Sequence, residues 1–142
     1  MSSIQALLDA RPTPARDAVI QSIQLSTAGD GEAWLDLFAE DAIVQDPYGP
    51  SPMDPSGEGH RGKAAIGEFC AAHIRPGGIK FQVRQAITAG DACVIVGTIT
   101  TKAPDGTVAW CEIFNLYEVD DQGKITRLRS FWDFEAMGET AF

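Results

Sequence analysis

The stretch VAWCEIFNLY, residues 108–117, has the composition of a buried β-strand with a carboxylate in its middle. Side chains alternate between the two faces of a strand, so Val108, Trp110, Glu112, Phe114 and Leu116 are expected to share one side. Glu112 is therefore predicted to lie among apolar neighbours. Burying an ionised carboxylate without a partner costs several kcal/mol or more, so such a group usually keeps its proton. Glu112 is therefore the first candidate for a catalytic residue.

The same alternation extends to both sides of this stretch. Residues 79–88 place Ile79, Phe81, Val83 and Ile87 on one face and Lys80, Gln82 and Arg84 on the other. This pattern is typical of an antiparallel sheet with one solvated side. Two further strands are predicted in residues 92–101 and 124–134, joined by glycine- and aspartate-containing turns.

The N-terminal half has helical spacing instead. Predicted helices cover residues 14–28, 31–41 and 63–74, with Trp34, Leu35 and Phe38 on one face of the second. Residues 42–46 form a short strand, and the Pro/Gly-rich residues 47–62 form a loop long enough to rim a pocket. The order predicts an α+β fold in which a curved antiparallel sheet wraps around three helices as a cone with an apolar mouth.

Composition limits the partners. A chain of 142 residues with 44% hydrophobic content suits one domain spanning residues 1–142. Its net charge of −9 argues against nucleic acid and membrane surfaces as partners. Cys70, Cys93 and Cys111 form no CxxC pair, which suggests reduced thiols and a cytoplasmic protein. The N-terminus lacks the pattern of a signal peptide, and no stretch approaches the ~20 apolar residues of a membrane span.

Two carboxylates are candidates for acid–base chemistry. Asp46 ends the short strand in the sequence IVQDPYG and is expected to face the same way as Val44, and Glu112 is the second. Carboxylates in different environments provide an acid and a base in one pocket. Two alternatives stay open: Asp46 before a proline is also a common turn element, and Glu112 on an edge can be solvated. The enzyme interpretation requires both carboxylates to face a common dry cavity, and placement on opposite faces would end it.

Other chemistries have less support. His60 and His73 lack partners at metal-ligand spacing, which favours structural roles for both. The sequence has no GxSxG elbow, P-loop or GxGxxG fingerprint. We expect neither a metal nor an organic cofactor.

Two stretches carry a family resemblance. AGDGEAWLDLFAEDAIVQDPYG (28–49), followed by GHRGKAAIGEF (59–69), resembles the ketosteroid isomerase and SnoaL-like branch of the nuclear transport factor 2 (NTF2-like) fold. VAWCEIFNLYEVDDQGKITRLRSFW (108–132) is similar to the last two strands of that family. The resemblance covers about residues 15–134 and is most specific in EDAIVQDPYG.

The resemblance implies a set of site residues. Asp46 matches the general base that moves a proton between two carbons of a steroid, and Glu112 falls on a protonated acid that donates to the oxygen. In ketosteroid isomerases an apolar site raises the pKa of this second acid, which therefore stays protonated. The family's third member, a tyrosine on the first helix, falls on Ser22, which is too short to replace it. Tyr48 or Tyr117 would have to compensate.

The resemblance also implies a flat apolar ligand. Trp132 falls where the family places an aromatic side chain against the ligand, with Leu128 and Phe134 beside it. The predicted contacts to the ligand are Ser22, Phe38, Tyr48, Trp110, Phe114, Leu128 and Trp132. We expect Arg127 and Arg129 to point away from the cavity that Trp132 lines.

The function expected from the resemblance is that of a Δ5-3-ketosteroid isomerase-like enzyme, with proton transfer next to a carbonyl. Three alternatives remain: a hydrophobic-ligand-binding protein without turnover, a polyketide-cyclase-like enzyme using Asp46 in an aldol closure, and an interaction module. A homodimer paired through the sheet is expected in each case.

Overall fold

The alternating stretches of the C-terminal half form the main sheet. The computed structural model describes residues 2–139. Its main antiparallel strands are β3 (Ile79–Ala89), β4 (Ala92–Lys102), β5 (Val108–Val119) and β6 (Ile125–Phe131), paired in chain order. Short β7 (Gly138–Glu139) pairs with β5.

The N-terminal half extends this sheet and makes it mixed. β1 (Phe38–Gln45) pairs parallel with β6, and β2 (His60–Arg61) pairs antiparallel with β1. The strand order is β2-β1-β6-β5-β4-β3. The parallel pair is possible because a helix-containing connection separates β1 from β6 in the chain.

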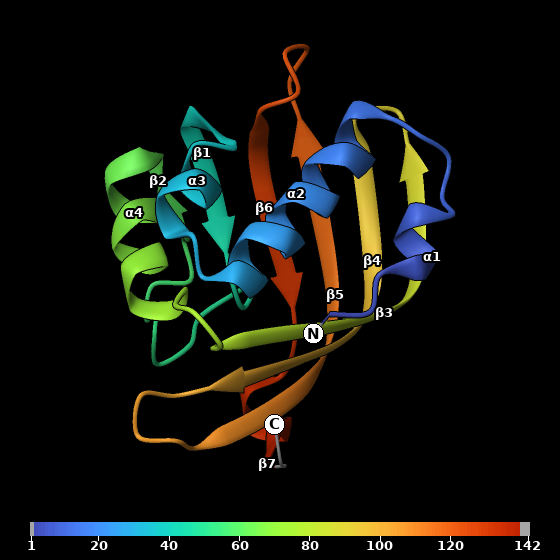
Figure 1. Ribbon diagram of the computed structural model, residues 1–142. Coiled ribbons are helices and arrows are strands. Elements are labelled where there is room, and N and C mark those ends of the chain that lie inside the picture. The colour runs from blue at the N-terminus through green and yellow to red at the C-terminus, as the bar shows by residue number, and fades with distance from the viewer. Residues whose placement is uncertain (1, 140–142) are drawn as a thin grey trace.

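The helices cover one face of the curved sheet (Figure 1). They are α1 (Gln5–Leu8), α2 (Pro14–Ala28), α3 (Gly31–Leu35) and α4 (Gly62–His73). In Figure 1, α2 crosses in front of the sheet, and the sheet bends strongly below it. The expected α+β cone is confirmed, with the short α1 added to the three predicted helices.

Capping explains the bounds of α2. The Thr13 side chain accepts a hydrogen bond from the backbone N–H of Arg16, and Pro14 occupies the first turn. Gly29 ends the helix with φ of 76°, a left-handed conformation that favours glycine. A Cβ at Gly29 would also collide with the backbone of Pro76, so this end of α2 lies directly on the segment after α4.

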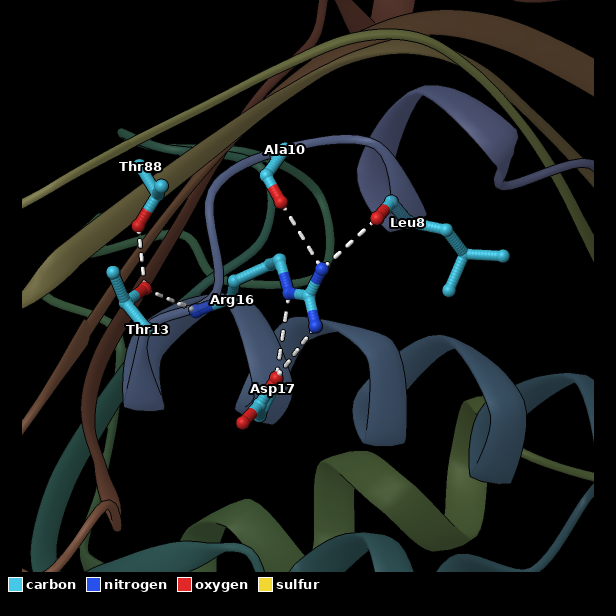
Figure 2. Close-up of polar contacts among 6 residues, drawn as sticks. All are labelled: Leu8, Ala10, Thr13, Arg16, Asp17 and Thr88. Atoms are coloured by element: carbon cyan, nitrogen blue, oxygen red, sulfur yellow. Dashed lines mark hydrogen bonds and ion pairs between the residues drawn. The ribbon is translucent and has the colours of Figure 1, made fainter.

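Arg16 makes hydrogen bonds to the segment that connects α1 to α2 (Figure 2). Its guanidinium donates to the carbonyl oxygens of Leu8 and Ala10 and pairs with Asp17. The Thr13 hydroxyl lies 2.5 Å from that of Thr88 at the end of β3. These bonds hold the start of α2 against the sheet and so fix the helix that carries Ser22.

The second predicted helix is shorter than expected. α3 ends at Leu35, and residues 38–41 belong to β1. The backbone of β1 pairs with β6 from Phe38 onward, with a register irregularity between Phe38 and Ile43. The prediction of helix through residue 41 was wrong because Phe38 fits the apolar face of a strand as well as that of a helix.

A bulge changes the face of β3 halfway along the strand. Ile79, Phe81 and Val83 are buried as predicted, but the register shifts between Val83 and Gln85. Ile87 is therefore turned outward and is 66% exposed, although period-two alternation placed it with the core.

The buried face of β5 is the odd-numbered one. Cys111, Ile113, Asn115, Tyr117 and Val119 are all buried, whereas Trp110, Glu112 and Phe114 are exposed. The three cysteines are free and buried. Within the described residues, no helix has the length and apolar character needed to cross a membrane.

Candidate active site

The cone encloses a cavity of about 290 Å³ between the helices and the inner face of the sheet. Its walls come from α2, α4, the inner faces of β3 to β6 and the segment around Phe134 and Met137. Most of the lining is apolar, and a few polar side chains converge on it, as is usual for small-molecule sites. Among the described residues that line it, Asp46 is the sole carboxylate.

Asp46 directly follows β1, whose inward residues Ala42 and Val44 are buried. The indole N–H of Trp132 donates to Asp46 Oδ1 at 2.6 Å. Burial raises the pKa of Asp46, while the hydrogen bond from Trp132 acts to lower it. The result is an oriented carboxyl group of increased basicity at the cavity wall.

A second polar group lies on the inner face of β5. The Ser130 hydroxyl donates to Asn115 Oδ1, and the Asn115 side chain also hydrogen-bonds Tyr117. The Tyr117 hydroxyl lies 3.3 Å from Ser22 Oγ, which accepts a hydrogen bond of 3.1 Å from the indole of Trp34. Side chains from α2, α3, β5 and β6 are thus linked in one network.

His73 also lines the cavity, although the sequence favoured a structural role. Its ring lies 4.7 Å from that of Phe69, which lies 5.0 Å from His60. Burial lowers the pKa of His73, and the nearby charge of Asp46 acts in the opposite direction. Within residues 2–139, no group of three or more potential metal-binding side chains is assembled.

Glu112 does not lie in the cavity. Its side chain is 59% exposed on the outer face of the sheet, where it pairs with Arg84 and accepts a 2.9 Å hydrogen bond from Thr98. The predicted burial was wrong because the strand presents its even-numbered side chains outward. Asp46 and Glu112 face opposite sides of the sheet, so the two-carboxylate enzyme expected from the sequence is excluded, and any catalysis has to rest on Asp46 without Glu112.

Three other predicted ligand contacts are also displaced. Phe38 belongs to the closed core and contacts Trp34 at 4.6 Å, without lining the cavity. Tyr48 is 49% exposed and packs on Phe131 on the outer face, where Phe114 is 42% exposed. These predictions were wrong because Phe38 is packed in the core away from the cavity, and because Tyr48 and Phe114 lie on the outer face of the sheet.

The structure does place Ser22, Leu128 and Trp132 around Asp46. Trp110 is found at the rim of the cavity, partly exposed, and the backbone of Gly138 lies against its ring. Arg127 and Arg129 lie on the outer side, as predicted, near Gln45 and Glu118 respectively.

Sequence reasoning missed Asn115, Ser130 and the position of Tyr117. One signal was present: the even-numbered face of β5 carries two carboxylates, Glu112 and Glu118, whereas the odd-numbered face carries none. Since charged side chains are rarely fully buried, the odd face was the better candidate for the interior.

Comparisons with known proteins agree with this architecture. Residues 19–128 match the SnoaL-like domain. The Δ5-3-ketosteroid isomerase from Mycobacterium sp. is 33% identical, with a TM-score of 0.83 over 91% of this chain and 100% of that chain. RV0760c from Mycobacterium tuberculosis is 27% identical, with a TM-score of 0.82 over 92% of this chain and 100% of that one.

Two of the similar structures are described by their ligands. RV0760c has been solved in complex with estradiol-17β-hemisuccinate. A computationally designed 17-OHP binder is 25% identical, with a TM-score of 0.84 over 92% of this chain and 100% of its own. The matched domain spans most of the sequence and the fold agrees throughout: the chain belongs to the SnoaL-like family, in the NTF2-like fold of ketosteroid isomerase.

Proposed function

We propose that the protein binds a flat, apolar, β,γ-unsaturated carbonyl compound of the steroid class and moves a proton from the carbon next to the carbonyl to the γ carbon. One observation carries the proposal: Asp46 is a single oriented carboxylate at the wall of an apolar cavity. A base in such a cavity has its pKa raised toward the pH at which it works.

The step is a proton abstraction. Asp46 takes a proton from a carbon adjacent to the carbonyl, the C–H electron pair forms a new C=C bond, and the carbonyl π pair moves to oxygen. Because the ligand carries a C=C bond at its β,γ carbons, the product of this step is a dienolate. Asp46 returns the proton to the γ carbon, the electron pair on oxygen re-forms the carbonyl, the C=C bond is left between the α and β carbons, and the carboxylate is regenerated. The hydrogen bond from Trp132 holds the carboxyl group between the two positions.

The class of ligand is supported by the cavity lining and by the similar proteins. Leu128, Trp132 and Phe134 line one part of the cavity, and Phe69 and Phe81 contribute elsewhere. Flat aromatic and aliphatic walls favour fused rings over polar substrates. The estradiol derivative bound to RV0760c and the 17-OHP of the designed binder are ligands of this shape.

The test is to incubate the protein with a 3-oxo-Δ5 steroid in deuterated water, following both the conjugated enone absorbance and deuterium incorporation. Asp46→Asn should reduce both by about 10²- to 10⁴-fold, since the amide keeps the shape but cannot take a proton. Glu112→Gln removes a carboxylate from the other face of the sheet and should leave both unchanged. Saturable binding without exchange by the wild type would favour the binding protein without turnover.

A second copy of the chain is proposed to cover the outer face of the sheet. Tyr48, Phe114 and Phe131 form an exposed aromatic cluster there, with ring centroids 4.9 Å and 5.7 Å apart. The ion pairs Arg84–Glu112 and Arg129–Glu118 flank the cluster and are neutral overall. A contiguous exposed aromatic surface with little net charge favours a two-fold symmetric homodimer.

A further inference from the structure

Once Glu112 is excluded, the proposed reaction lacks a group to hold the ligand's oxygen. Ser22, at the position where the family resemblance expects a tyrosine, is too short for that purpose. The cavity lies between Ser22 on α2 and the inner face of β5, and Tyr117 extends from β5 until its hydroxyl meets Ser22. The cavity therefore does contain a phenol, and β5 of the sheet carries it instead of α2.

We propose that the Tyr117 hydroxyl donates the hydrogen bond that holds the carbonyl oxygen of the ligand, with Ser22 and Asn115 as its positioning residues. The inference rests on the proposed function and identifies the group that works opposite Asp46. It also predicts that the ligand's carbonyl end lies deep in the cone, beside α2 and β5.

Hydrogen-bond capacity supports this orientation of Tyr117. Asn115 Oδ1 already accepts from Ser130, so the Asn115 amide N–H₂ is the group available to donate to Tyr117. Ser22 Oγ accepts from the indole of Trp34 and lies 3.3 Å from the Tyr117 hydroxyl, and either hydroxyl of this pair can be the donor. When Ser22 donates, the hydrogen of Tyr117 is left for a ligand acceptor.

The electrostatics fit a donor that stays neutral. Burial raises the pKa of Tyr117 to about 12, so the phenol keeps its proton throughout the neutral range. Asp46 lies close enough to raise that pKa further by its charge, which places base and hydroxyl on one cavity. Because the hydroxyl is held by neighbours before the ligand enters, it needs little reorganisation when negative charge develops on oxygen.

The experiment is infrared difference spectroscopy of a Δ4-3-oxo steroid labelled with carbon-13 at the C3 carbonyl. In the wild type, the bound carbonyl stretch should lie below its value in an apolar solvent. Tyr117→Phe should return the stretch to the apolar value, weaken binding about tenfold through the lost hydrogen bond, and lower kcat by about 10²-fold. Tyr48→Phe deletes the exposed phenol of the outer face and is the matched control, with no shift expected.

Two more variants test the positioning residues and guard against misfolding. Ser22→Ala should give a smaller carbonyl shift than the wild type with binding retained, because the phenol keeps only the Asn115 donor. Tyr117→3-fluorotyrosine keeps the shape, makes the phenol more acidic and should enlarge the shift. An unchanged carbonyl frequency in Tyr117→Phe or Tyr117→3-fluorotyrosine overturns the assignment.

Failure of the inference can be separated from failure of the proposed function. A shifted carbonyl that depends on Tyr117, with no deuterium exchange, removes the catalytic step and keeps Tyr117 as the ligand's donor. Deuterium exchange that depends on Asp46, with a carbonyl stretch insensitive to Tyr117, does the reverse. No steroid binding by the wild type overturns both.

Discussion

The two faces of β5 both carry mostly apolar side chains, but one face is buried and the other is largely exposed. The odd-numbered face is buried and carries Asn115 and Tyr117 into the cavity. The even-numbered face exposes Trp110 and Phe114 on either side of Glu112. Apolar content alone therefore does not identify the core face of a strand in this fold. The carboxylates, which appear only on the outer face, do identify it.

The largest difference between the two faces is expected in the free energy of unfolding when neighbouring residues of β5 are truncated. Ile113 is 4% exposed, so Ile113→Ala should lower the free energy of unfolding by about 2–5 kcal/mol through lost burial and a cavity. Phe114→Ala should cost the folded monomer less than about 1 kcal/mol. Urea unfolding measures both, and the dependence of its midpoint on protein concentration separates loss of a dimer from loss of the fold. Equal losses in the monomer would contradict the assignment of faces.

The outer face can be tested through assembly. If a second copy covers Phe114, Phe114→Glu places a carboxylate in the interface twice, once from each copy. The loss should reach about 2 kcal/mol or more, so the dimer dissociation constant should rise at least ~30-fold. Sedimentation velocity over a concentration series measures it.

The control for assembly is Leu8→Glu, which charges another exposed apolar residue, on α1 at the helix side of the sheet. It should leave the dissociation constant unchanged. A wild type that is monomeric at every concentration, or equal weakening by both variants, would refute pairing through the outer face.

Much of the fold was predictable because period-two alternation is strong from Ile79 onward and the caps around α2 are explicit. Asp46 was predictable for the same local reason, since it follows a short apolar strand in a distinctive Asp-Pro sequence. The role of a base at that position was implied only by the family resemblance and stays a proposal.

The rest depended on non-local geometry. Ile87 moved outward because of a bulge at Val83 and Gln85, which alternation cannot reveal. Glu112 was misplaced because alternation divides the side chains of a strand into two faces but does not say which face packs against the helices. Tyr117 was considered only as one of two compensating tyrosines, since its approach to Ser22 depends on how far α2 lies from the sheet.

The inner and outer carboxylates should also differ in how stability depends on pH. The pKa of Asp46 is raised in the folded state, so the unfolded chain ionises first as pH rises above about 4. Wild-type stability should therefore fall relative to Asp46→Asn as pH increases from there, and the two should converge below it. Chemical unfolding from pH 3 to 8 measures the difference.

Asp105 supplies a control of opposite sign. It lies in the turn between β4 and β5, where the backbone N–H of Thr107 lowers its pKa. Asp105→Asn should lose stability relative to the wild type as pH rises, because the carboxylate is the stabilised form. A pH-independent difference for Asp46→Asn would show that its pKa is not raised in the folded protein.

The smallest effect on stability is expected at Glu112, the carboxylate in the middle of β5. Glu112 pairs with Arg84 while both side chains remain about half exposed, and such surface pairs contribute roughly 0–1 kcal/mol. In a monomeric background such as Phe114→Glu, Glu112→Gln should cost less than about 1 kcal/mol, and the cost should shrink with added salt. If a second copy covers this face in the wild type, the cost should be larger there, because the partner would remove water from the pair and the substitution would leave Arg84 without its counter-charge. Urea unfolding of both backgrounds at low and high salt measures the difference. An equal, small loss in both would place Glu112 outside any interface, and a large loss in the monomer would show that the outer face is not open to water.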